Sequence, residues 1–188
     1  MNEITNHAEL TVEKKKEGKY MRNRILMYIG YAIAPILAII LLSIIIEGGA
    51  LIGLIAIVPT YPFLLAKVII PMTKPFIDIE EKMDISGGHL TLTTVYGRKK
   101  SKDLCKIKVS LFDAIAPYNN PEYKKAADDF KYDKRYEAVS SMAHPDVYYA
   151  YGTNEFGEKV ICFFEVTNKG LKVMKFLNKK TVVTEVSR

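Results

Sequence analysis

The residue types that most often carry chemistry are few in this sequence. Two cysteines and three histidines are spread along the chain, at Cys105, Cys162, His7, His89 and His144. Their spacing matches no zinc-binding pattern, in which ligands come in closely spaced pairs. Each cysteine lies in a stretch with the pattern of a buried strand, where a thiol is usually inert. We expect no metal, no cofactor and no catalytic residue, and both thiols should be reduced in a cytoplasmic domain.

Recognisable catalytic and nucleotide-binding motifs are missing as well. The sequence contains no glycine-rich phosphate loop, no Walker-type lysine and no Ser-x-x-Lys set. The net charge of +6 arises from basic residues that are interspersed with acidic ones, which is not the basic face of a nucleic-acid-binding domain. We therefore expect a protein that is not an enzyme, with a small enzyme or a transporter subunit as the remote alternative.

A cluster of cations is the strongest local candidate for binding. The stretch "RKKSK" lies between two predicted strands and contains Arg98, Lys99, Lys100 and Lys102. Such a turn can contact the phosphates of anionic lipids, and each cation near the surface adds roughly 1 kcal/mol. The alternative is a solvated turn whose charges discourage aggregation at the sheet edge.

Two long apolar runs determine where these groups can act. They are "ILMYIGYAIAPILAIILLSIII" at residues 25–46 and "ALIGLIAIVPTYPFLLAKVIIPM" at residues 50–72. As a helix, the first would be about 33 Å long, which matches the hydrocarbon core of a bilayer. Only Glu47, Gly48 and Gly49 separate the runs, which is enough for a tight turn. The sequence predicts a two-helix transmembrane hairpin over residues 25–72.

The charges that flank the hairpin predict its orientation. The turn between the runs has no basic residue, whereas several precede the first run and one follows the second. These flanking cations are Lys14, Lys15, Lys16, Lys19, Arg22, Arg24 and Lys74. By the positive-inside rule, both termini should be cytoplasmic, so we expect a multi-pass protein of the cell membrane with two spans.

Small residues recur at four-residue spacing in both apolar runs. They are Gly30, Ala34 and Ala38 in the first run, and Gly49 and Gly53 at the start of the second. Such stripes allow helix backbones to approach closely. They either pack the hairpin against itself or join copies of the chain into a homo-oligomer.

The pattern changes from helical to alternating after Pro75. Strands are predicted around "DIEEKMDI", "HLTLTTVYG" and "CKIKVSL", and a further hairpin turns at residues 154–157. The stretch "NKGLKVMKFLNKK" predicts an amphipathic C-terminal helix. We expect an α+β fold in which residues 75–188 form a small antiparallel β-barrel or curled sheet capped by this helix, as in a pleckstrin-homology-like (PH-like) domain. Residues 1–24 are expected to be a basic cytoplasmic segment.

Three stretches carry a resemblance to a known group of proteins. "DIEEKMDISGGHLTLTTVYGRKKSK", "DAIAPYNN" and "DFKYDKRYEAVSS" resemble a family of uncharacterised bacterial membrane proteins described only as a domain of unknown function. The resemblance implies a membrane hairpin followed by a PH-like cytoplasmic domain, and it implies no activity. We expect a membrane-anchored interaction module that binds a protein partner at the inner face of the membrane, because acidic residues flank the basic turn and limit a pure lipid role. The alternative is a domain that reads anionic lipid through the basic turn.

Overall fold

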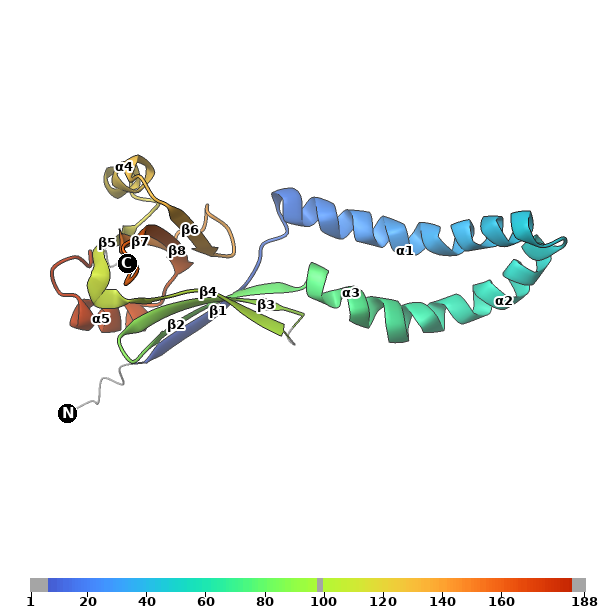
Figure 1. The fold of residues 1–188 in the computed structure, drawn as a ribbon, viewed down its shortest axis with the longest axis horizontal. Helices are drawn as coiled ribbons and strands as arrows, with labels where there is room; N and C mark the ends of the chain where they lie inside the picture. Colours follow the sequence, from blue (N-terminus) through green and yellow to red (C-terminus); the bar gives the residue numbers. More distant parts are fainter. Residues whose placement is uncertain (1–6, 98–99, 184–188) are drawn as a thin grey trace. The chain divides into compact units, whose positions relative to one another are not determined.

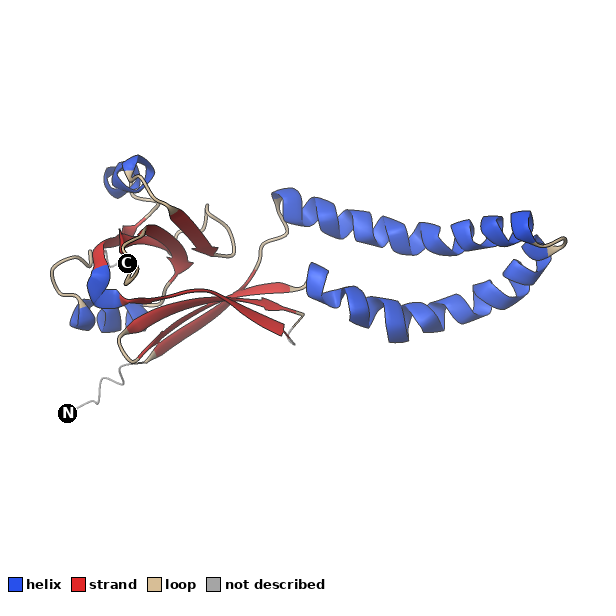
Figure 2. Ribbon diagram, viewed as in Figure 1, coloured by secondary structure: helices blue, strands red, loops and turns tan. Residues whose placement is uncertain are grey.

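The chain forms two compact units in a computed structural model that describes residues 7–97 and 100–183 (Figure 1). One unit combines Met1–Lys15 with Ile79–Arg188, and the other consists of Lys16–Asp78. The second unit is therefore an insertion within the first. Figure 2 shows that the insertion is helical, whereas the unit around it is built mainly of strands.

The inserted unit is a helical hairpin. Helix α1 spans Gly18–Ile45 and helix α2 spans Gly49–Leu64. A π-helical segment, Leu65–Ile69, connects α2 to α3, Ile70–Ile77, so that one helix continues from Gly49 to Ile77. Pro71 accounts for the widened turn, since it has no amide hydrogen and its ring crowds the carbonyl four residues earlier.

Both helices expose apolar side chains, and each is long enough to cross a membrane. In the first helix, no residue of the most apolar 18-residue stretch is buried. In the second helix, 11% of the most apolar 18-residue stretch is buried. The helices extend beyond the predicted spans of residues 25–46 and 50–72, whereas the predicted turn is confirmed. Gly48 has a φ of 76° there, a conformation that favours glycine.

The first sheet contains four antiparallel strands in the order β1-β2-β3-β4. Strand β1 spans Ala8–Glu13, β2 Ile79–Ser86, β3 His89–Tyr96 and β4 Lys100–Lys108. Strand β1 corrects the predicted domain bounds, because part of the segment 1–24 belongs to the sheet. The first residues of the predicted domain, 75–77, are instead the end of α3. Its residues alternate between apolar and polar from Ala8 to Glu13, which is the pattern of a half-buried strand, but the partner strand follows only after the hairpin.

The second sheet has the order β5-β7-β8-β6. Its strands are β5 Phe112–Pro117, β6 Lys134–Ala138, β7 Val147–Thr153 and β8 Lys159–Glu165. A 3-10 turn, Val109–Leu111, links β4 to β5, which ends the predicted third strand earlier than expected. The prediction of a single small antiparallel barrel or curled sheet was wrong, because the strands form two separate sheets and β6 is parallel to β8.

Two helices complete this unit, of which the C-terminal one was predicted. Helix α4, Pro121–Asp129, begins with Asn120 as its cap, because the Asn120 side chain accepts a hydrogen bond of 3.0 Å from the amide of Glu122. Helix α5, Asn168–Leu177, contacts β1 and β2. Its buried face includes Leu171 and Met174, which join the main core formed between the sheets.

A second, smaller core lies under α4. It contains Ala127 of that helix together with Tyr149, Ile161 and Phe163 of the second sheet. Strands β7 and β8 are thus buried on both faces, which is why their sequences are almost continuously apolar or aromatic.

Candidate functional site

The described part of the basic turn lies at a defined end of the first sheet. Lys100 and Lys102 are exposed on the first residues of β4, whereas Arg98 and Lys99 lie outside the described residues. Lys100 pairs with Tyr96, which in turn pairs with Ile79 at the start of β2. The turn therefore lies at the end of the sheet where the chain returns from the helical hairpin.

The other lysines of β4 do not extend this cluster. Lys108 ends the strand, and at about 3.3 Å per residue it lies roughly 26 Å from Lys100. Its ammonium group pairs with Glu155 at 2.8 Å. The basic residues of β4 thus form two separate groups, of which only the first adjoins the hairpin junction.

A buried carboxyl group holds the sheet together beside that junction. Glu81 of β2 is only 3% exposed, and its Oε1 accepts a hydrogen bond of 3.2 Å from Lys14 Nζ. Its Oε2 accepts one of 2.8 Å from the hydroxyl of Thr94 on β3. Burial raises the pKa of Glu81, against the opposing effects of Thr94 and Lys14. The contacts tie the end of β1 to β2 and β3, which indicates a structural role.

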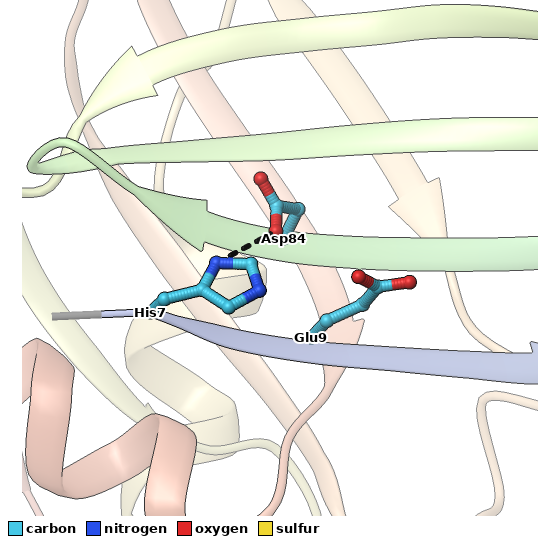
Figure 3. Close-up of side chains that lie close together, drawn as sticks. All are labelled: His7, Glu9 and Asp84. Atoms are coloured by element: carbon cyan, nitrogen blue, oxygen red, sulfur yellow. Dashed lines mark ion pairs between the residues drawn. The ribbon is translucent and has the colours of Figure 1, made fainter. Parts of the chain in front are cut away.

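A histidine and two carboxylates gather on the exposed face of β1 and β2 (Figure 3). His7 Nδ1 lies 3.4 Å from Asp84 Oδ1, and Glu9 pairs with Lys82 at 2.9 Å. The hydrogen bond from Lys82 lowers the pKa of Glu9. This group was not predicted, because its members come together only when β1 pairs with β2. A cation placed there would compete with Lys82 at an open surface, and we assign no metal site.

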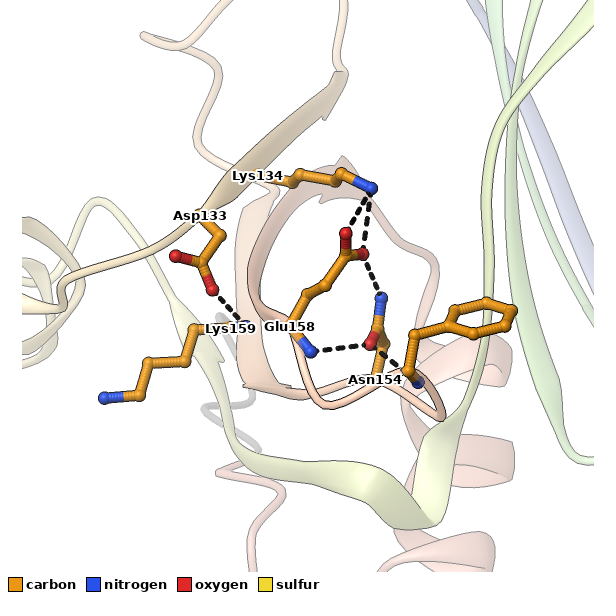
Figure 4. Close-up of polar contacts among 6 residues, drawn as sticks. Asp133, Lys134, Asn154, Glu158 and Lys159 are labelled. Carbon is orange, nitrogen blue, oxygen red and sulfur yellow. Dashed lines mark hydrogen bonds and ion pairs between the residues drawn. The ribbon is translucent and has the colours of Figure 1, made fainter.

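The turn between β7 and β8 is ordered by side-chain contacts (Figure 4). Asn154 Oδ1 accepts hydrogen bonds of 2.9 Å from the amides of Phe156 and Glu158. The Glu158 carboxylate pairs with Lys134 of β6 at 2.6 Å and accepts a hydrogen bond of 2.8 Å from Asn154 Nδ2. Gly157, at the end of the turn predicted at residues 154–157, has a φ of 79°, which favours glycine.

The ordered turn presents an aromatic side chain to solvent. Phe156 is 87% exposed. Among the residues that the structure describes, no other large hydrophobic side chain is as exposed. Glu155, its neighbour, is fixed by the ion pair with Lys108. The turn is therefore held in one shape while the Phe156 ring lies in solvent.

An open pocket of about 370 Å³ lies where β5 ends and α4 begins. Its lining is mixed, with prolines, amides, a carboxylate and an aromatic ring: Pro117, Asn119, Asn120, Pro121, Pro145, Asp146 and Tyr148. The Asn119 side chain donates a hydrogen bond to the carbonyl of His144. Asn120 is engaged as the α4 cap. Two of its polar groups thus serve the local fold, so the pocket offers few free groups to orient a ligand.

The small residues of the hairpin fall into two groups. Gly49 and Gly53 are buried against α1, where an added Cβ would lie 2.0 Å from the carbonyl oxygen of Leu42 and 3.2 Å from Ile39 Cγ1 respectively. At Gly30 an added Cβ would meet nothing within 4 Å, and Ala34 is exposed. Ala38 is half-buried. Close packing inside the hairpin therefore uses the glycines of α2.

One protein-family model matches nearly the whole chain. The model of the family described as "Bacterial PH-like domain (DUF6106)" matches residues 4–184. The chain belongs to this family. No curated protein and no solved structure shows significant similarity to it. The predicted resemblance is thereby confirmed, and the match includes both β1 and the helical hairpin.

The contact between the two cysteines of the PH-like domain was not predicted from the sequence. Cys105 lies on β4 in the first sheet and Cys162 on β8 in the second. Their sulfur atoms are 3.9 Å apart. Spacing along the chain could not indicate this contact, because it depends on how the two sheets pack.

Proposed function

We propose that this PH-like domain is anchored in the cell membrane by its helical hairpin and works as an interaction module at the cytoplasmic face. The pairing of β1 with β2 carries the proposal. Strand β1 precedes the hairpin and β2 follows it, yet the two strands are hydrogen-bonded neighbours from Ala8–Ile85 to Glu13–Glu80. Both ends of the hairpin must then lie on one side of the membrane, which two spans satisfy.

The exposed surface of the helices supports membrane insertion. Ile44 and Ile45 are about three-quarters exposed, and Phe63 is 69% exposed, although all three are strongly apolar. In water such a surface would be far larger than the patches that soluble proteins tolerate. A cleaved signal sequence fits poorly, because cleavage after α1 would remove β1 from the sheet.

The flanking charges support a cytoplasmic domain. Lys14, Lys15 and Lys16 precede α1, and Lys74 lies near the end of α3, whereas the turn at Glu47 has no cation nearby. Under the positive-inside rule, this asymmetry supports a cytoplasmic location for both ends of the hairpin.

Labelling of introduced cysteines tests this topology. In a Cys105→Ser, Cys162→Ser background, Glu47→Cys should react with a membrane-impermeant maleimide on intact cells. Lys179→Cys, on the exposed surface of the domain, should react only after lysis. The reverse pattern, or labelling of neither position before lysis, would contradict the proposed topology.

We assign the β7–β8 turn as the surface that meets a protein partner. The exposed ring of Phe156 and the contacts that hold the turn in one shape support this assignment. A pre-ordered anchor loses little conformational entropy on binding. The domain is thus proposed to bind rather than to catalyse.

Site-specific cross-linking in cells tests this assignment. A photoreactive benzophenone amino acid in place of Phe156 should give a discrete adduct, whose partner mass spectrometry identifies. The same amino acid at Lys106, exposed on the first sheet, is the control and should give no such adduct. Equal adducts at both positions would argue against a specific surface.

The register of the first sheet favours a second candidate, contact of the basic turn with anionic lipid. One residue separates the end of α3 from Ile79, the first residue of β2. Lys100, at the start of β4, lies at the same end of the sheet as Ile79. A domain tethered so closely brings Lys100 and Lys102 within reach of the inner leaflet.

This candidate is tested in nanodiscs containing the full chain. An environment-sensitive fluorophore at Ser101→Cys, in the cysteine-free background, should report a less polar environment when anionic lipid replaces neutral lipid. The change should fade with salt, and it should vanish in a Lys99→Gln, Lys100→Gln, Lys102→Gln variant. An identical signal in both lipids would leave the turn as a solvated connection.

A further inference from the structure

The contact between Cys105 and Cys162 joins the two sheets at one point of the main core. Cys105 comes from the edge strand β4 and Cys162 from β8, which lies inside the second sheet between β6 and β7. Both sulfur atoms are free thiols, and their separation is 3.9 Å. Formation of an S–S bond of about 2 Å therefore requires each sulfur to move by roughly 1 Å.

A β-bulge lies directly beside Cys105 in β4. Leu92 pairs with Cys105, but the next residue, Thr93, pairs with Asp103, so that Leu104 is the extra residue of β4. Leu104 and Cys105 consequently both pack against the main core, although they are consecutive. Bulges of this kind often re-aim side chains and are typical of functional positions.

The two thiols differ in accessibility. Cys162 is completely buried, whereas Cys105 is only partly buried. The hydrogen bond with Cys105 and burial raise the pKa of the Cys162 thiol, which keeps this sulfur protonated. Cys105 is thus the sulfur that a small reagent from solution can reach first.

We propose that Cys105 and Cys162 form a reversible two-thiol redox site, which a peroxide converts into a disulfide between the two sheets. This inference is independent of the membrane topology and of any partner.

The chemistry needs one two-electron oxidant and no other reactant. The Cys105 thiolate attacks one oxygen of hydrogen peroxide, the O–O bond breaks, and Cys105 becomes a sulfenic acid while hydroxide leaves and takes up the thiol proton as water. The Cys162 sulfur then attacks the Cys105 sulfur, the S–O bond breaks, and a second water leaves with the proton of Cys162. In sum, two thiols and one peroxide give one disulfide and two waters. A dithiol reductant reverses the change.

The disulfide would change the mechanical coupling of the domain. In the reduced state, β4 and β8 are held by side-chain packing, without a backbone ladder between the sheets. A covalent bond would fix the edge strand that begins with Lys100 against the strand that follows the Phe156 turn. Oxidation would thereby restrain the two surfaces described above with respect to each other.

Peptide mapping of the wild-type full chain is the primary test. The protein is reduced in detergent, freed of reductant and exposed to hydrogen peroxide, and its disulfides are mapped under non-reducing conditions. We expect a linked pair of peptides containing Cys105 and Cys162, loss of both titratable thiols, monomeric mobility on a non-reducing gel and full reversal by dithiothreitol. The oxidised chain should also melt at a higher temperature than the reduced chain.

Two serine variants identify the order of the steps. In Cys162→Ser, dimedone should trap the sulfenic acid at Cys105, because no second thiol can displace it. In Cys105→Ser, the buried Cys162 should stay unmodified under the same conditions.

Three results would overturn the proposal. The first is persistence of both wild-type thiols after a small thiol in the same solution has been fully oxidised. The second is over-oxidation of Cys105 beside a free Cys162. The third is the formation of disulfides only between chains. Each of these results is read from the wild type, so none depends on correct folding of a variant.

Discussion

The backbone amide of Lys14 donates a hydrogen bond of 2.9 Å to the carbonyl oxygen of Ile79. These two residues flank the helical insertion, so the points where the chain leaves and re-enters the β unit are neighbours. The insertion could therefore be removed without separating the strands. The same contact implies that a domain fragment has to contain β1 as well as the residues after the hairpin.

We expect a chain in which residues 16–78 are replaced by a short Gly-Ser turn to fold as a soluble β unit. The matched comparison is a fragment that starts at residue 76 and lacks β1. Loss of β1 exposes the core around Met83 and Ile85, whose neighbours Ala8 and Leu10 belong to that strand. A single lost leucine contact of this kind costs about 2–5 kcal/mol. Thermal unfolding followed by circular dichroism should show a cooperative transition for the first chain and none for the second.

The stability of the β unit should depend on pH through Glu81. Burial raises the pKa of this carboxyl above its ordinary value of 4.5. The folded state therefore holds the proton to a higher pH than the unfolded state. The contribution of Glu81 to the free energy of unfolding is fully present below the ordinary pKa. It is lost as the pH rises through the pKa of the folded state. In Glu81→Gln, the melting temperature should depend less on pH over this window.

Glu155→Gln provides the control for this pH dependence. The hydrogen bond with Lys108 lowers the pKa of Glu155, so its contribution has the opposite sign, and its full exposure keeps that contribution small. An unchanged pH profile in Glu81→Gln would show that the buried carboxyl does not couple to folding.

Asn154→Ala should destabilise the β7–β8 turn by about 1–2 kcal/mol, because it removes the acceptor of two backbone amides. Phe156→Ala should change the free energy of unfolding by less than about 0.5 kcal/mol, since the ring is almost fully exposed. Denaturant unfolding of the two variants measures both values. A large loss of stability in Phe156→Ala would mean that the ring serves the fold, which would contradict its assignment to a partner.

Substitution of leucine for glycine should distinguish the two groups of small residues in the hairpin. Gly53→Leu should force α2 away from Ile39 of α1 at a cost of about 1–3 kcal/mol. Gly30→Leu should leave the spacing of the helices unchanged, because nothing lies within 4 Å of its added Cβ. Distances between spin labels on α1 and α2 report the spacing. Light scattering of Gly30→Leu tests whether this open face joins copies of the chain, since a fall in mass would reveal such an oligomer.

Most elements with a strong local pattern could be predicted from the sequence. The turn at Gly157, the cap of α4 at Asn120 and the apolar stripe of α5 all depend on residues close together in the chain. Strand β1 also has a local pattern, since Ala8, Leu10 and Val12 alternate with polar residues, but its place in the sheet could not be predicted because its partner β2 lies beyond the hairpin.

Features that depend on packing between the two sheets could not be predicted from the sequence either. The alternation of Cys105 and Ile107 correctly indicated a buried face, but it could not reveal the bulge at Leu104 or the contact with Cys162. The buried Glu81 was also hidden, because a charged residue in an amphipathic strand reads as solvent-facing until its partners Lys14 and Thr94 are known. These are tertiary relationships, and no local periodicity records them.

The insertion of the hairpin between β1 and β2 also sets an order for biogenesis. The ribosome completes β1 well before β2, and the apolar helices emerge between them. On the proposed topology, β1 has to wait in the cytoplasm, unpaired, while the translocon accepts both helices. The first sheet can form only after β2, which follows the hairpin in the chain, has been synthesised. Because β1 and β2 are far apart in the sequence, membrane insertion would precede folding of the domain on this topology.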